Sequence, residues 1–158
     1  MKGHKLNNED AIRFIFAGNS TSTFVNSKTG NRFTFKVKKS KEKDSNLYFV
    51  SVLTSPEIYT YIGIISNETY KHGKKSSISQ TAQSVKVFDY VLNKLRENNL
   101  PESIEVWHEG SCGKCGRQLT VPFSITVGIG PECYKKLYKE DKRELLLDSL
   151  LALGIEEL

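Results

Sequence analysis

Apolar and polar residues alternate with a period of two along several short stretches in the first two-thirds of the chain. Between residues 32 and 38, Phe33, Phe35 and Val37 occupy every second position, and polar or basic residues lie between them. That period puts aromatic side chains on one face of a strand and cations on the other. Strands are predicted at residues 20–25, 32–38, 47–54, 59–65 and 69–72, with a hairpin turn at residues 28–31.

Helical spacing of apolar residues marks three other segments. A long helix is predicted at residues 80–98, where an apolar stripe is formed by Val85, Phe88, Leu92 and Leu95. A short helix is predicted at residues 9–17, and a leucine-rich helix at residues 142–153. We expect the leucine-rich helix to pack on the main domain, and dimerisation or partner contact is the alternative. Together these elements predict an α+β fold in which helices cover an antiparallel sheet.

All three cysteines lie in one segment of the chain, beside one of its three histidines. Cys112 and Cys115 form a C-x2-C pair, His108 precedes the pair, and Cys133 follows it. Three thiolates and one imidazole are the ligand set of a closed tetrahedral zinc site. The spacing therefore predicts one structural Zn²⁺ held by His108, Cys112, Cys115 and Cys133.

The residues around the cysteines predict how the chain brings these ligands together. Gly113 and Gly116 suit a tight turn, and Pro131 is favoured at a helix start, which places Cys133 in the first helical turn. Residues 119–121 and 125–127 are rich in β-forming types and predict a short hairpin between the two parts. A cysteine turn, a hairpin and a helix form a treble-clef-like zinc module.

Two alternatives to this ligand set remain open at this stage. The three cysteines are also compatible with free thiols buried as small apolar residues. His108 follows Trp107 and could be a core or hydrogen-bonding residue, with water or a partner group as the fourth ligand. A filled tetrahedron leaves no position for a catalytic water, and no phosphate loop, nucleophile elbow or paired-acid motif is visible. We therefore expect no enzymatic activity and no small-molecule substrate.

Charge is distributed unevenly along the chain. Residues 1–100 carry a net charge of +8 and residues 101–158 a net charge of −3. This predicts a basic α+β domain at residues 1–100, followed by the zinc module and leucine-rich helix at residues 101–158. The basic part is the candidate surface for an acidic partner. No apolar run is long enough to cross a membrane, and the N-terminus lacks the apolar core of a signal peptide. An odd number of cysteines argues against a disulfide framework, and reduced, metal-bound cysteines fit the cytoplasm.

The cysteine segment resembles a zinc domain of unknown function that occurs in many bacteriophage proteins. The resemblance rests on residues 106–122 and on the Gly-Ile-Gly-Pro-Glu-Cys sequence of residues 128–133. Upstream, residues 14–19, 28–30, 48–54 and 59–63 are similar to the same proteins. The resemblance implies His108, Cys112, Cys115 and Cys133 as metal ligands. It also implies a phage protein acting in the cytosol of a bacterial host, and small accessory phage proteins often bind a host machine.

Two functional hypotheses follow from the resemblance and the charge. The first is a non-enzymatic, zinc-containing inhibitor of a host defence nuclease, specifically an anti-CRISPR protein that contacts Cas9. A basic chain does not fit DNA mimicry, so such an inhibitor would meet an acidic protein surface or a bound nucleic acid. The alternative is direct binding of nucleic acid through the basic segments 36–43 and 71–75, with tyrosines available for stacking. The candidate partner-binding residues are Lys36, Lys38, Lys39, Lys41, Lys43, Lys71, Lys74 and Lys75.

Overall fold

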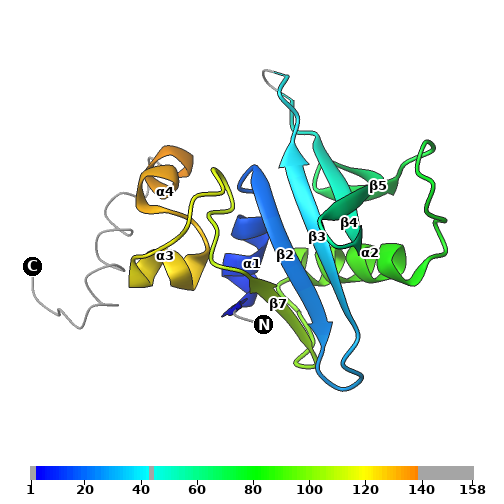
Figure 1. The fold of residues 1–158 in the computed structure, drawn as a ribbon, viewed down its shortest axis with the longest axis horizontal. Helices are drawn as coiled ribbons and strands as arrows, with labels where there is room; N and C mark the ends of the chain where they lie inside the picture. Colours follow the sequence, from blue (N-terminus) through cyan, green and yellow to red (C-terminus); the bar gives the residue numbers. More distant parts are fainter. Residues whose placement is uncertain (1–2, 43–44, 139–158) are drawn as a thin grey trace, which may run out of the picture.

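The computed structural model of the chain describes residues 3–42 and 45–138, which form a mixed α+β fold (Figure 1). Its helices are α1 (Asn8–Ile15), α2 (Gln83–Arg96), α3 (Pro122–Val127) and α4 (Pro131–Leu137). Its strands are β1 (His4–Leu6), β2 (Asn19–Asn26), β3 (Arg32–Lys39), β4 (Tyr48–Ser55), β5 (Ile58–Ser66), β6 (Thr69–His72) and β7 (Ile104–His108). Within the described ranges, no helix is long and apolar enough to span a membrane.

The strands form one seven-stranded antiparallel sheet in the order β1-β7-β2-β3-β4-β5-β6. The predicted antiparallel sheet is confirmed, and β2 to β6 begin and end within one residue of the predicted strands. Strands β1 and β7 are additions to the predicted set. Because β7 lies between β1 and β2, the sheet takes strands from both sides of the predicted domain boundary at residue 100.

One face of the sheet is packed against α2. The Phe88 ring lies 4.9 Å from Phe35, 5.4 Å from Tyr70 and 5.7 Å from Phe24, measured between ring centroids. The predicted apolar stripe of this helix is buried, and so are Phe35 and Val37 of β3. The alternation in β3 therefore has its expected effect, because its apolar positions face α2 and its basic positions face away from the helix.

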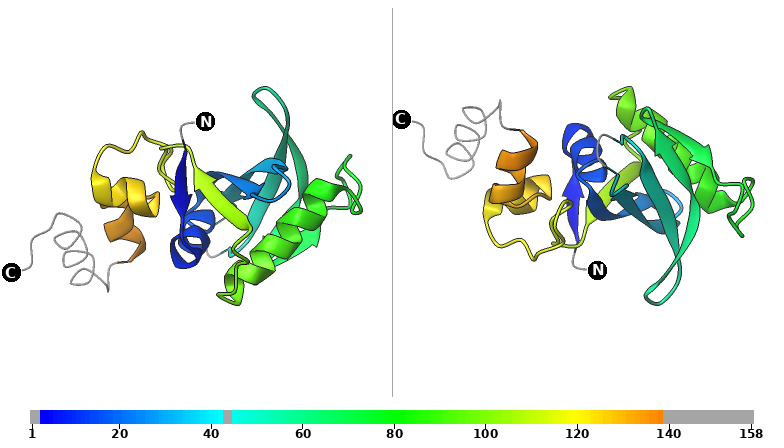
Figure 2. Two further views of the ribbon diagram at one scale, coloured as in Figure 1. Left: turned by 90° about the horizontal axis from the view of Figure 1, so that it is seen from below. Right: turned by 90° about the horizontal axis from the view of Figure 1, so that it is seen from above.

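The cysteine segment forms a second, smaller apolar cluster beside the sheet. This cluster buries Ala17, Cys112, Leu119, Val127, Ile129 and Tyr134. In Figure 2, α3 and α4 lie together at one end of the molecule, and α2 lies at the other end. The leucine-rich helix predicted at residues 142–153 lies outside the described residues.

The predicted hairpin within the cysteine segment is wrong, because residues 122–127 form α3 instead. Pro122 occupies the first turn, where its fixed φ favours a helix start, and Gly128 ends the helix in the left-handed region at φ 79°. These two boundaries override the β propensity of the residues between them. A treble-clef layout is not confirmed, since a helix stands where its hairpin would be.

Candidate functional site

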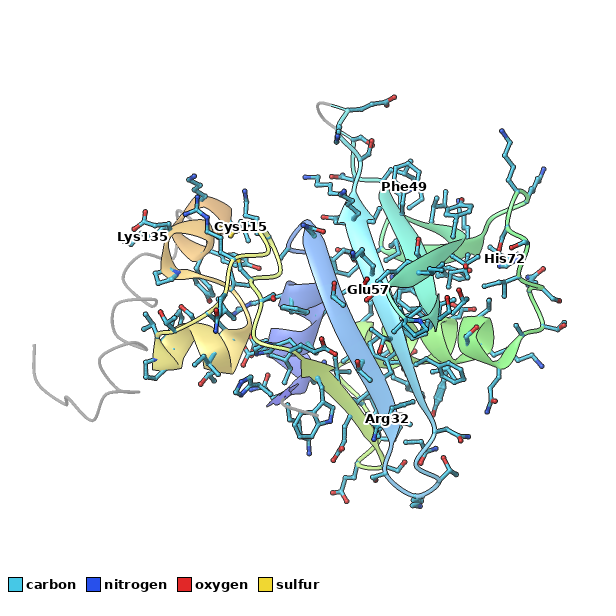
Figure 3. All side chains as sticks on the ribbon, in the orientation of Figure 1. Arg32, Phe49, Glu57, His72, Cys115 and Lys135 are labelled. Atoms are coloured by element: carbon cyan, nitrogen blue, oxygen red, sulfur yellow. The ribbon has the colours of Figure 1, made fainter. Side chains whose placement is uncertain are left out.

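The three cysteine thiols converge on one point between the loop after β7 and the start of α4. The Sγ atoms of Cys112, Cys115 and Cys133 all lie within 4.8 Å of one another. Cys112 is buried, Cys133 is half-buried and Cys115 is exposed, and none of them forms a disulfide. Figure 3 shows Cys115 on the loop that faces α4, the helix that carries Lys135. Three thiols at this separation are a ligand set that could hold a metal ion.

Backbone hydrogen bonds fix the turn that carries the first two cysteines. The N–H of Gly116 donates to the carbonyl of Cys112 at 2.9 Å, which closes the turn around Cys115. Gly116 has φ 79°, a conformation that favours glycine, as the sequence predicted for this turn. The N–H of Cys112 in turn donates to the carbonyl of Arg117 at 2.8 Å. The turn that carries the pair is therefore closed by hydrogen bonds of its own backbone.

Backbone N–H groups also point directly at one sulfur. Gly130 and Lys114 donate to the Sγ of Cys112 at 3.3 and 3.4 Å. Burial raises the pKa of Cys112, but the N–H groups of Gly130, Cys115 and Lys114 outweigh burial, so the net pKa is lowered. Such N–H groups stabilise a thiolate, which is the form that binds metal.

The pKa of Cys133 is shifted in the opposite direction, and the cause of this shift also favours a bound cation. Burial and the neighbouring Cys115 and Cys112 sulfurs raise the pKa of Cys133 to about 11. Three thiolates packed together repel one another, so without a counterion one of them keeps its proton. A divalent cation removes this penalty, and the donor set therefore fits a divalent metal ion.

The structure does not bring His108 to the three thiols. The ring is fully buried in β7, and its Nε2 lies 2.6 Å from the carbonyl oxygen of Ile125. The N–H of Gly110 donates to Nδ1 at 3.0 Å. A carbonyl only accepts and an N–H only donates, so the imidazole is the neutral tautomer with its proton on Nε2. Burial and the nearby His4 lower the pKa of His108, although the Ile125 hydrogen bond acts against them.

This arrangement favours the hydrogen-bonding alternative for His108 over the ligand assignment. A neutral imidazole has one lone pair on a ring nitrogen, and Gly110 already occupies it. His108 instead ties β7 to α3 and lies against the Phe14 ring, with their centroids 5.5 Å apart.

Phe14 of α1 is the contact that fixes the cysteine segment on the sheet domain. A Cβ atom added at Gly128 would lie 2.5 Å from the Phe14 ring, and one added at Gly113 would lie 2.8 Å from it. The backbone N–H of Asn19 also donates to the carbonyl of Gly113 at 2.7 Å. The spacing of the glycines alone does not predict this packing, because the Phe14 ring lies far away in the chain.

The predicted partner-binding lysines fall into two separate groups. One groove of about 420 Å³, on β3, the loop after it and β4, is lined by Lys36, Lys38, Lys39 and Lys41. Lys71 lies on β6, and Lys74 and Lys75 lie on the connector after it, near the labelled His72 in Figure 3. Lys43 lies outside the described residues. The described lysines of residues 36–43 therefore share one surface, and the lysines of residues 71–75 lie outside it.

Aromatic side chains share the sheet face that carries these lysines; Phe49 is exposed, and Tyr59 and Tyr61 are half-buried. Phe49 pairs with Lys38, is 43% exposed and lines the same groove. The Lys36 Nζ lies 4.4 Å from the centroid of the Tyr59 ring. Tyr61 is on this face too, because it pairs with Ser51, the partner of Lys36. We call the face formed by the groove and these rings the basic aromatic face.

Two other tyrosines that seemed available for stacking are engaged elsewhere. Tyr70 is buried against α2 and donates to the carbonyl of Ile62 at 3.0 Å. Tyr48 donates to the carbonyl of Phe16 at 3.1 Å and packs edge-on against its ring. The sequence analysis did not select Phe49. The alternation that turns Tyr48 and Val50 inward was the signal that Phe49 points outward.

Comparison with known proteins gives one match, to a family whose function is not known. Residues 107–138 match the family described as "Family of unknown function (DUF6011)". The match covers the cysteine segment and leaves most of the sheet outside it. No curated protein and no solved structure matches the chain.

Proposed function

We propose that this protein is a zinc-stabilised binding protein. The convergence of three thiols with N–H groups directed at the Cys112 sulfur carries the zinc part of this proposal. Zn²⁺ is the metal that cysteine-rich sites of this size most commonly take. The ion would join the turn after β7 to α4 and so stabilise the small apolar cluster around it.

Metal content and thermal stability test the zinc site. Purified protein should contain close to one zinc per chain by elemental analysis, and a chelator should lower its melting temperature. Cys112→Ser should abolish both the metal and the chelator effect. Ser111→Ala, a neighbouring exposed position, is the matched control and should change neither. Wild-type protein that holds no metal and does not respond to chelation would exclude the site.

The partner we propose is single-stranded nucleic acid, bound on the basic aromatic face. The observation that favours it is the exposed Phe49 ring within a groove lined by Lys36, Lys38 and Lys39. Unpaired bases stack on exposed rings, and lysines beside the rings pair with the phosphates. A duplex keeps the faces of its bases stacked inside, so the rings favour a single strand.

Binding of a fluorescent single-stranded oligonucleotide, followed by anisotropy across a salt series, tests this partner. Phe49→Ala should weaken binding by roughly 5-fold or more, since one stacked base contributes about 1–3 kcal/mol. Tyr90→Ala is the matched control, because Tyr90 is 44% exposed but lies on α2, against the opposite face of the sheet. Lys38→Ala should reduce the salt dependence by roughly one phosphate contact. Equal affinity of the two aromatic variants would rule out the face.

Inhibition of Cas9 in a bacterial cytosol is a further proposal that rests on the phage resemblance described above. The basic aromatic face supports it only as far as it offers a surface for an acidic protein or a guide RNA. A pull-down against Cas9 with and without guide RNA tests it. If Phe49→Ala also lost Cas9, the same face would serve both partners, whereas no association under either condition would remove this proposal.

A further inference from the structure

The part of the chain that the structure describes supplies three ligands to the metal site, and tetrahedral zinc takes four. Among residues 3–42 and 45–138, the group that could hold an ion consists of Cys112, Cys115 and Cys133 alone. His108 does not complete the set, because its available lone pair accepts from Gly110. A zinc site with three protein ligands leaves its fourth position to a molecule from solution.

A pocket lies beside the three thiols, where such a molecule would bind. Its volume is about 170 Å³, and all three cysteines line it together with Ser124, Gln118 and Arg117. A water molecule occupies about 30 Å³, so the pocket is large enough for a ligand bigger than one water. Because Cys115 is exposed, the pocket can be reached from solvent.

The Ser124 hydroxyl is the second observation that points to a ligand. Its side chain is only 1% exposed, and its Oγ has no hydrogen-bond partner among the described residues. A buried hydroxyl left without a partner costs about 1–3 kcal/mol. Since Ser124 lines the pocket, a ligand there would give this hydroxyl the partner that it lacks within the protein.

We propose that the zinc ion in this site keeps one exchangeable coordination position for a neutral nitrogen or oxygen donor, which the Ser124 hydroxyl binds by a hydrogen bond. This inference rests on the proposed zinc site. Zn²⁺ with three thiolates carries a net negative charge, so a neutral donor is favoured over an anion. Water fills the position by default, and an imidazole, such as that of a partner's histidine, replaces it.

Cobalt substitution makes this position visible. Tetrahedral Co²⁺ bound by thiolates gives visible d–d bands that change with the fourth ligand. Imidazole titrated into the full-length Co²⁺ protein should shift these bands to a saturable end point. N-methylimidazole coordinates in the same way but has no second N–H to donate to Ser124, so it is the matched ligand control.

Variants of the two buried, unpartnered serines separate the hydroxyl's role from general effects of substitution. Ser124→Ala should weaken imidazole binding about 5-fold, the equivalent of one hydrogen bond of about 1 kcal/mol, and leave N-methylimidazole binding unchanged. Ser22→Ala removes the other buried hydroxyl without a described partner, on β2 and outside the pocket, and should change neither affinity.

The outcomes distinguish failure of this inference from failure of the zinc site. Protein that binds no Co²⁺ or Zn²⁺ refutes the site and this inference together. A Co²⁺ spectrum that does not respond to imidazole leaves the site in place and overturns the exchangeable position. Equal imidazole affinity in wild type and Ser124→Ala overturns the part assigned to the hydroxyl.

Discussion

Gly128 is a position where a single added methyl group should weaken the packing of the cysteine segment on the sheet domain. It ends α3 at φ 79°, and a Cβ built there lies 2.5 Å from Cδ1 of Phe14 and 3.3 Å from the His108 ring. Phe14 is itself buried in the main core, so its ring has little room to move away. Gly128→Ala therefore combines backbone strain with a steric clash.

The magnitude follows from these two effects taken separately. A non-glycine residue in the left-handed region costs about 1–2 kcal/mol. Forcing a methyl group into a packed core costs about 1–3 kcal/mol more. Gly30→Ala isolates the first effect, because Gly30 has φ 78° and a Cβ there meets nothing within 4 Å. The difference between the two variants is then the cost of the contact with Phe14.

Thermal and urea unfolding of zinc-saturated protein measure this difference. For a domain of this size, each kcal/mol lowers the melting temperature by roughly 2–4 °C, so Gly128→Ala should melt several degrees below Gly30→Ala. In a Phe14→Leu background the clash is reduced, and the additional cost of Gly128→Ala should shrink. Equal losses in the two alanine variants, or no change of the cost in that background, would show that the segment does not pack on α1 through Phe14.

Three further predictions concern the metal site and its surroundings. Zinc affinity should fall as the pH falls, because the pKa of Cys133 is raised to about 11 in the metal-free protein. Each proton that must leave on binding lowers the zinc affinity roughly tenfold per pH unit. Competition with a chelating indicator between pH 6 and 8 measures this dependence, and a flat profile would contradict it. Cys115→Ser should lose the metal and melt like the chelated wild type, since its exposed side chain contributes little packing of its own; a variant that still binds one zinc per chain would contradict the ligand assignment. His108→Ala should destabilise the protein by about 2–5 kcal/mol, because it leaves a cavity and removes two hydrogen bonds. The variant should still bind one zinc per chain. Loss of the metal from protein that is still folded would restore His108 as a ligand.

Local patterns predicted most of the sheet, because a strand with one buried face has a period of two that is visible in the sequence. β2 to β6 are joined in order along the chain, so neighbouring strands pair and the topology follows from the order. The position of β7 does not follow in this way. Its pairing with β1 and β2 brings together residues that are 78 to 104 positions apart, and no local pattern encodes that choice. The α3 helix was missed for a different reason, since two boundary residues overrode the β propensity between them.

The same contrast between local and long-range contacts explains why the three cysteines could be predicted to converge, while the position of His108 could not be predicted. The C-x2-C pair is placed by its own turn, and Cys133 by the proline that begins its helix, so both depend on neighbours in sequence. His108 lies in β7, two residues after the buried Val106, and the sheet register turns its ring inward opposite Ser22. There both ring nitrogens form hydrogen bonds with the backbone of Gly110 and Ile125, and the ring does not join the three thiols. Spacing from the cysteines carries no information about that register, so a histidine at a ligand-like distance in sequence can be committed to the sheet. In the proposed zinc site, the fourth position then falls to a ligand from outside the described residues.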